Sequence, residues 1–69
     1  MKIKYFLDTD TLYIEFKALE IVESKDLDEN TVLDLDSKGN ICAITVEHAS
    51  ARTDLRHFSY EQLATWSIN

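Results

Sequence analysis

Apolar and polar residues alternate through the first two thirds of the chain, as they do in β-strands that bury one face. Ile3 and Tyr5 alternate with two lysines, and Leu12, Ile14 and Phe16 alternate with polar or charged neighbours. The alternation returns in three later segments. We therefore expect strands at residues 2–5, 12–17, 20–25, 31–36 and 41–47.

Polar segments at residues 7–11, 26–30 and 36–40 predict turns between these strands. The only glycine, Gly39, stands where a hairpin needs a positive φ, at the bulge position that follows a type I turn. Short connections favour antiparallel neighbours. The expected architecture of residues 1–47 is thus an antiparallel β-meander of about five strands, or a close relative of one.

The last third of the chain carries helix signals. Residues 48–52 are expected to form one helical turn. Ser59 and Gln62 then form a capping box, while Phe58 and Leu63 form a hydrophobic staple. Leu63 and Trp66 are three residues apart and would share one helix face. We therefore expect a single α+β domain over residues 1–69, with a β-meander (1–47) followed by a helical C-terminal segment (48–69) that includes a short C-terminal helix.

Composition and charge narrow the class of protein. The 69 residues have an apolar fraction of 45% and a formal net charge of −6, from 13 acidic and 7 basic residues. Ten acids and two lysines lie in residues 8–36, a local net charge of −8. This acid excess argues against direct nucleic-acid binding. The longest apolar run has four residues, so we expect no membrane span and a cytoplasmic location. Because a core this small supplies only about 3–5 kcal/mol, we expect a homodimer.

Three groups of residues invite a chemical interpretation, and each has a simpler one. Asp34-x-Asp36-x-Lys38-Gly39 resembles a calcium loop, but Lys38 and Thr45 replace ligands, so a β-turn in which Asp36 accepts backbone N–H bonds is expected. The carboxylates at positions 8, 10, 26, 28 and 29 lie in predicted exposed turns. Cys42, His48 and His57 have no common zinc spacing. We expect no catalytic residue, no cofactor and no metal.

The sequence resembles a family of short microbial proteins, the domain-of-unknown-function family twenty-two eighty-three, over about residues 1–52. The residues that carry the resemblance are Met1-Lys2-Ile3-x-Tyr5, Asp10-x-Leu12-Tyr13-Ile14, Val22-Glu23-Ser24, Leu33-Asp34-Leu35-Asp36, Gly39-x-Ile41, Ile44-x-Val46 and Ala49-Ser50. The resemblance supports a compact sheet domain. It also implies a companion of small toxin-like proteins, hence an antitoxin or immunity partner.

These observations predict a small, acidic, non-enzymatic protein-binding domain with a basic protein partner, in a more specific form the antitoxin-like or immunity half of a two-protein module. The alternative is an acidic mimic of nucleic acid that inhibits a nucleic-acid-binding protein, and an enzyme is the third reading. The residues expected to contact a partner are Tyr13, Glu15, Phe58, Tyr60, Leu63 and Trp66.

Overall fold

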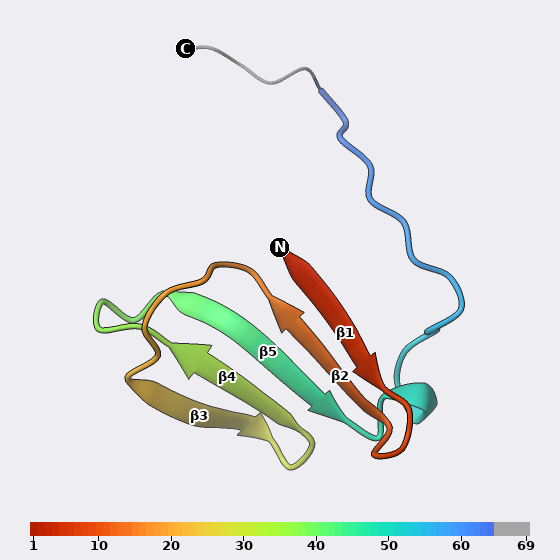
Figure 1. Cartoon of the computed structure of the whole chain (residues 1–69), viewed down its shortest axis with the longest axis horizontal. Helices are drawn as coiled ribbons and strands as arrows, with labels where there is room; N and C mark the ends of the chain where they lie inside the picture. Colours follow the sequence, from red (N-terminus) through yellow and green to blue (C-terminus); the bar gives the residue numbers. More distant parts are fainter. Residues whose placement is uncertain (65–69) are drawn as a thin grey trace.

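Five antiparallel strands form one open sheet in the computed structural model, which describes residues 1–64 (Figure 1). The elements are β1 (Lys2–Phe6), β2 (Thr11–Glu15), β3 (Glu23–Asp28), β4 (Thr31–Leu35), β5 (Ile41–Glu47) and a 3₁₀ turn, η1 (Ala49–Ala51). All five predicted strands are present. The third begins and ends later than the alternation indicated.

The strand order is β1-β2-β5-β4-β3. Strands β3, β4 and β5 follow one another as a meander, and β1 and β2 form a separate hairpin that pairs with β5 through β2. Residues 16–22 carry the chain from β2 to β3 at the far edge of the sheet (Figure 1). The meander is therefore interrupted once, between β2 and β3, because β5 and β4 lie between these two strands.

The turn between β4 and β5 has the predicted form. Gly39 has a φ of +82°, and its N–H donates to the Asp36 carbonyl at 3.1 Å. The Asp36 carboxylate accepts the backbone N–H groups of Lys38 at 2.9 Å and Asn40 at 2.8 Å. These bonds confirm the expected β-turn in which Asp36 accepts backbone N–H groups.

The turn between β3 and β4 is tighter than expected. Residues 26–30 were predicted as a polar turn, but β3 continues to Asp28, with a bulge between Asp26 and Asp28. The Asp28 carboxylate accepts the backbone N–H of Asn30 at 2.8 Å. This side-chain bond closes a short hairpin, so fewer residues are needed for the reversal.

Side chains separate onto two faces of the sheet because successive residues of a strand point to opposite sides. On one face, cross-strand partners form an aliphatic row across four strands: Ile3, Ile14, Ile44 and Leu33. We call this the aliphatic face. The opposite, polar face carries the row Lys2, Glu15, Ala43, Asp34 and Ser24.

Little of the sheet is buried. Within residues 1–64, the buried apolar side chains are Leu12, Cys42, Ala43 and Ala49, and Cys42 is the largest that is fully buried. The molecule measures 18 Å along its shortest axis. Within residues 1–64, η1 is bonded to the β1–β2 turn, and residues 53–58 lie over the adjoining corner of the sheet.

The α+β assignment is wrong. In the part of the chain that the structure describes, the only helical element is the 3₁₀ turn at Ala49–Ala51, and residues 58–64 form no helix despite the capping box. A helix of about eight residues is not stable in water without a surface to pack on. Phe58 and Leu63 are 71% and 89% exposed, so these two staple residues bury little apolar surface here. Trp66, the other expected anchor, lies outside the described residues.

Candidate functional site

The polar face presents a tyrosine beside two carboxylates. Tyr13 and Glu15 lie two residues apart on β2, and Asp34 on β4 pairs with Ala43, the cross-strand partner of Glu15. Ala43 is fully buried, so these polar side chains cover it. We call Tyr13, Glu15 and Asp34 the acidic cluster.

The pKa of Tyr13 responds to both carboxylates of the cluster. Desolvation raises the pKa of the phenol above its usual value, and the negative charges of Glu15 and Asp34 raise it further. Among residues 1–64, neither carboxylate forms an ion pair, and Asp34 accepts a hydrogen bond from the Ser24 hydroxyl at 2.8 Å. The cluster therefore places two carboxylates that form no ion pair within residues 1–64 near an aromatic ring.

A second polar group ties the β1–β2 turn to η1. The Asp10 carboxylate accepts the Tyr5 hydroxyl at 2.6 Å, the Ser50 hydroxyl at 2.7 Å and the Ser50 N–H at 3.0 Å. Asp10 and His48 both have a positive φ, 53° and 54°. The pKa of Asp10 is lowered, first by the Tyr5 hydroxyl and then by Ser50. With its oxygens occupied by these donors, Asp10 has a structural role at this corner.

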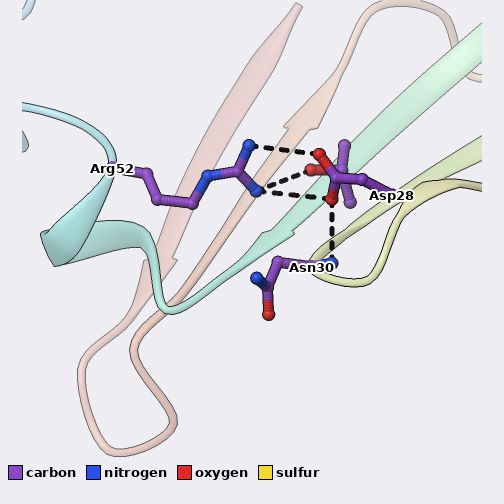
Figure 2. A network of polar contacts seen from close by, with 4 residues as sticks. Asp28, Asn30 and Arg52 are labelled. Atoms are coloured by element: carbon purple, nitrogen blue, oxygen red, sulfur yellow. Dashed lines mark hydrogen bonds and ion pairs between the residues drawn. The ribbon is translucent and has the colours of Figure 1, made fainter.

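Arg52 joins the end of η1 to the β3–β4 hairpin (Figure 2). Its guanidinium contacts both carboxylate oxygens of Asp28, with Nη2 at 3.2 Å from Oδ2 and Nη1 at 3.5 Å from Oδ1. Nη1 also donates to the buried Thr31 hydroxyl at 3.0 Å. The Asn30 N–H donates to the same carboxylate. These contacts hold the chain that leaves η1 beside the β3–β4 hairpin.

The chain beyond Arg52 borders an open hollow. Ile3, Tyr5, Leu12 and Ile14 line its sheet side, and Thr53, Asp54, Leu55, His57 and Phe58 line the other side. The hollow has a volume of about 280 Å³. His57 Nδ1 lies 2.7 Å from Asp54 Oδ2, an exposed contact within the same segment. These residues cover the edge of the aliphatic face over β1 and β2.

The predicted partner-contacting residues fall on different parts of the molecule. Tyr13 and Glu15 lie on the polar face, whereas Phe58 borders the hollow on the aliphatic face. Tyr60 and Leu63 follow in an extended segment and are 69% and 89% exposed. Trp66 is outside the described residues. The structure thus gives two separate surfaces instead of one joint site.

The groups with candidate metal or thiol chemistry lie apart. No three ligand-type side chains come together within residues 1–64 to hold a metal ion. Burial raises the pKa of the Cys42 thiol, and Asp36 and Asp34 raise it further, which disfavours the reactive thiolate. In the described part of the chain, no helix has the length and apolar character needed to cross a membrane.

Sequence reasoning missed the links that Asp10, Ser50, Arg52 and Asp28 make. The Asp10–Ser50 bonds join residues 40 positions apart, and the Arg52–Asp28 pair joins residues 24 apart. Such distant pairings have no periodic or local signal. Asp10 and Ser50 do both belong to the pattern that carries the family resemblance, and this was the one available hint.

The fold is a small all-β domain with one open, single-layer antiparallel sheet and a corner fixed by polar contacts. The chain belongs to the family described as "Protein of unknown function (DUF2283)", whose model matches residues 2–50. The matched region covers all five strands and most of η1. No curated protein and no solved structure matches the chain.

Proposed function

We propose that this chain is a non-enzymatic protein-binding domain whose acidic cluster receives a lysine or arginine side chain of a basic partner. The observation that carries the proposal is the half-buried Tyr13 ring near two carboxylates that form no ion pair within residues 1–64. A cation over a tyrosine face is attracted by the ring, and neighbouring carboxylates add charge-assisted hydrogen bonds.

The carboxylates with a lowered pKa support a binding role over an enzymatic one. Hydrogen bonds lower the pKa values of Asp10, Asp28 and Asp36. A general acid at neutral pH needs the opposite shift, produced by burial or a like charge. These three carboxylates serve as acceptors that hold turns and corners together, and the acidic cluster remains as the surface for recognition.

The more specific form of the proposal is that the partner is the basic member of a two-protein module in the cytoplasm, with this chain as the antitoxin-like or immunity half. The net charge of −6 would speed association with such a partner through long-range attraction. Co-expression tests this form: the chain should neutralise a basic toxin-like protein encoded beside it, and Tyr13→Ala should weaken that protection.

A peptide titration tests the binding site itself. Amide chemical shifts of the full chain are followed while an arginine hexapeptide is added, with a glutamate hexapeptide as the reference probe. We expect shifts centred on Tyr13, Ala43 and Asp34. Tyr13→Ala and Glu15→Gln should each weaken binding about two- to fivefold, and Tyr13→Phe, which keeps the ring, should weaken it less.

Glu47→Gln is the matched control, because Glu47 carries the same charge on the polar face at the other end of β5. An equal loss of affinity in Glu47→Gln and Glu15→Gln would show unspecific attraction to the acidic chain. That result would contradict a site at Tyr13.

The alternative function, mimicry of nucleic acid, needs a continuous run of negative charge. Lys2 lies beside Glu15 on the polar face, and Lys4 lies beside Tyr13. These two cations interrupt the acidic surface near the cluster. The mixed charge favours contact with individual basic side chains over imitation of a phosphate backbone.

A further inference from the structure

We propose that the aliphatic face is a self-association surface, on which a second copy of this chain packs face to face to form a two-layer sandwich. This surface is opposite the acidic cluster, so this proposal and the proposed function can fail independently. The evidence is the exposure of the aliphatic row, the total surface of the chain, the placement of charge and the protection of the sheet edges.

Among residues 1–64, no second layer of secondary structure covers the aliphatic row. Ile3 is 40% exposed, and Ile14, Ile44 and Leu33 are only half-buried although they lie at the middle of the face. The residues after η1 lie across the hollow from Ile3, Tyr5, Leu12 and Ile14, whereas Ile44 and Leu33 do not line it. A sheet with one apolar face is stable when another layer packs on that face.

The accessible surface is large for a chain of this size. The chain exposes 5820 Å², whereas a compact monomer of 8.0 kDa exposes about 4,500 Å². The excess is larger than the roughly 800 Å² that each partner contributes to a stable interface of standard size. The open face and the exposed residues 56–64 both contribute to it. On the open face, the apolar side chains that remain exposed or half-buried are the surface that a second copy would bury.

Charge placement favours a second copy over a basic partner on this face. The polar-face positions of the strands carry Glu15, Asp26, Asp34 and Glu47, which would point away from the interface. On the aliphatic face, the row ends beside Lys25, and the nearby Asp28 is neutralised by Arg52. Glu23, two residues before Lys25, lies on this side too, but at the edge strand β3. Two such faces can therefore meet with acids kept away from the centre of the row, despite the net charge of −6.

The sheet edges disfavour pairing side by side. Edge strand β1 carries Lys2 and Lys4, and edge strand β3 contains a bulge and several charged residues. Charges and bulges on edge strands prevent backbone pairing with another chain. Packing through the face, with sheets about 10 Å apart, leaves these edges exposed to solvent. A two-fold axis near Ile44 would place each aliphatic row across its copy.

Sedimentation and thermal unfolding of the full chain test the proposal. Between about 1 and 200 µM, the sedimenting mass should rise towards twice 8.0 kDa, and the melting temperature should rise with concentration because association stabilises the folded state. A single species of 8.0 kDa with a constant melting temperature would overturn the proposal.

Ile44→Lys and Thr45→Lys are a matched pair for locating the interface. Both reduce the net negative charge by one at adjacent positions of β5, but Ile44 lies on the aliphatic face and Thr45 on the polar face. We expect Ile44→Lys to raise the dissociation constant of the dimer at least tenfold and Thr45→Lys to change it less than twofold. Equal dimerisation of both folded variants would overturn face-to-face packing and indicate an edge contact.

Ile3→Lys provides the same test at a less demanding position, should Ile44→Lys lose its sheet signal in circular dichroism. Ile3 belongs to the aliphatic row but lies on the edge strand and is already 40% exposed. We expect the dimer of the Ile3→Lys variant to have a dissociation constant at least fivefold higher than that of the wild type. An unchanged constant in folded Ile3→Lys would count against the proposal.

Discussion

Gly39 is a residue whose importance comes from backbone conformation alone. Its φ is +82°, yet a Cβ atom built there meets nothing within 4 Å. We therefore expect Gly39→Val to lower the free energy of unfolding by about 1–2 kcal/mol through backbone strain. Gly39→Asn should cost less, because asparagine tolerates this region. Denaturant midpoints measure both; equal midpoints for wild type and Gly39→Val would contradict the turn described above.

Three aspartates make stability depend on acid pH. Asp10, Asp28 and Asp36 have a lowered pKa in the folded chain, chiefly through hydrogen bonds from Tyr5, from the Asn30 N–H and from Asn40, respectively. An unfolded aspartate has a pKa of about 3.9. Their stabilisation is thus complete above about pH 4 and is lost as the pH falls through the lower folded-state values.

Urea unfolding at a series of pH values measures this dependence. The midpoint should fall below about pH 4 in the wild type, and it should fall less steeply in Asp36→Asn, which removes one titrating group while keeping an acceptor oxygen. Asp8→Asn is the control, since Asp8 has no recorded hydrogen bond within residues 1–64. A midpoint that stays constant down to pH 3 would contradict the structural role of these carboxylates.

At the scale of elements, the segment after Phe58 carries the sequence signal for a helix start but forms no helix. Ser59 stands in a capping box, but residues 59–64 are not helical. We therefore expect Ser59→Ala to leave the free energy of unfolding unchanged within about 0.3 kcal/mol, whereas loss of a working N-cap costs about 1 kcal/mol. Chemical denaturation measures the difference. A loss near the larger value would show that a helix forms there in solution.

The strands were predictable because their signals are local. The alternation around Leu12 and Ile14 shows which side chains share a face, and Gly39 with Asp36 marks a hairpin. The position of β5 between β2 and β4 was not predictable, because it depends on which apolar rows match across strands distant in sequence. The helix was predicted wrongly because a cap stabilises a helix end without supplying the surface on which a short helix must pack.

The candidate site was predictable in part. Alternation places Tyr13 and Glu15 together on the outer face, and the structure has them there. Asp34 joins them only through the β4–β5 register, which the sequence does not contain. Phe58 and Tyr60 were grouped with them because both are aromatic residues without an assigned core position. Residue type could not reveal that Phe58 borders the aliphatic face, on the other side of the sheet from Tyr13.

For the whole molecule, uneven charge predicts a dependence on salt. The chain has thirteen acidic and seven basic residues. Within residues 1–64, the only ion pair between a lysine or arginine and a carboxylate is Arg52–Asp28. Repulsion between acids on the polar face and in the turns therefore outweighs attraction. Screening lengths shorten from about 30 Å at 0.01 M to about 3 Å at 1 M ionic strength, so added salt weakens this repulsion.

We expect sodium chloride to raise the urea midpoint between about 0.02 and 0.5 M, with most of the gain below about 0.2 M, where the screening length falls to the spacing of neighbouring side chains. Sodium chloride is preferred to sulfate, which also strengthens apolar burial. Glu15→Gln should reduce the salt dependence because it removes one charge from the acidic cluster, while Arg52→Gln should increase it by leaving Asp28 uncompensated. A midpoint that falls as salt is added would show that ion pairs, and not repulsion among the acids, dominate the electrostatics of this fold.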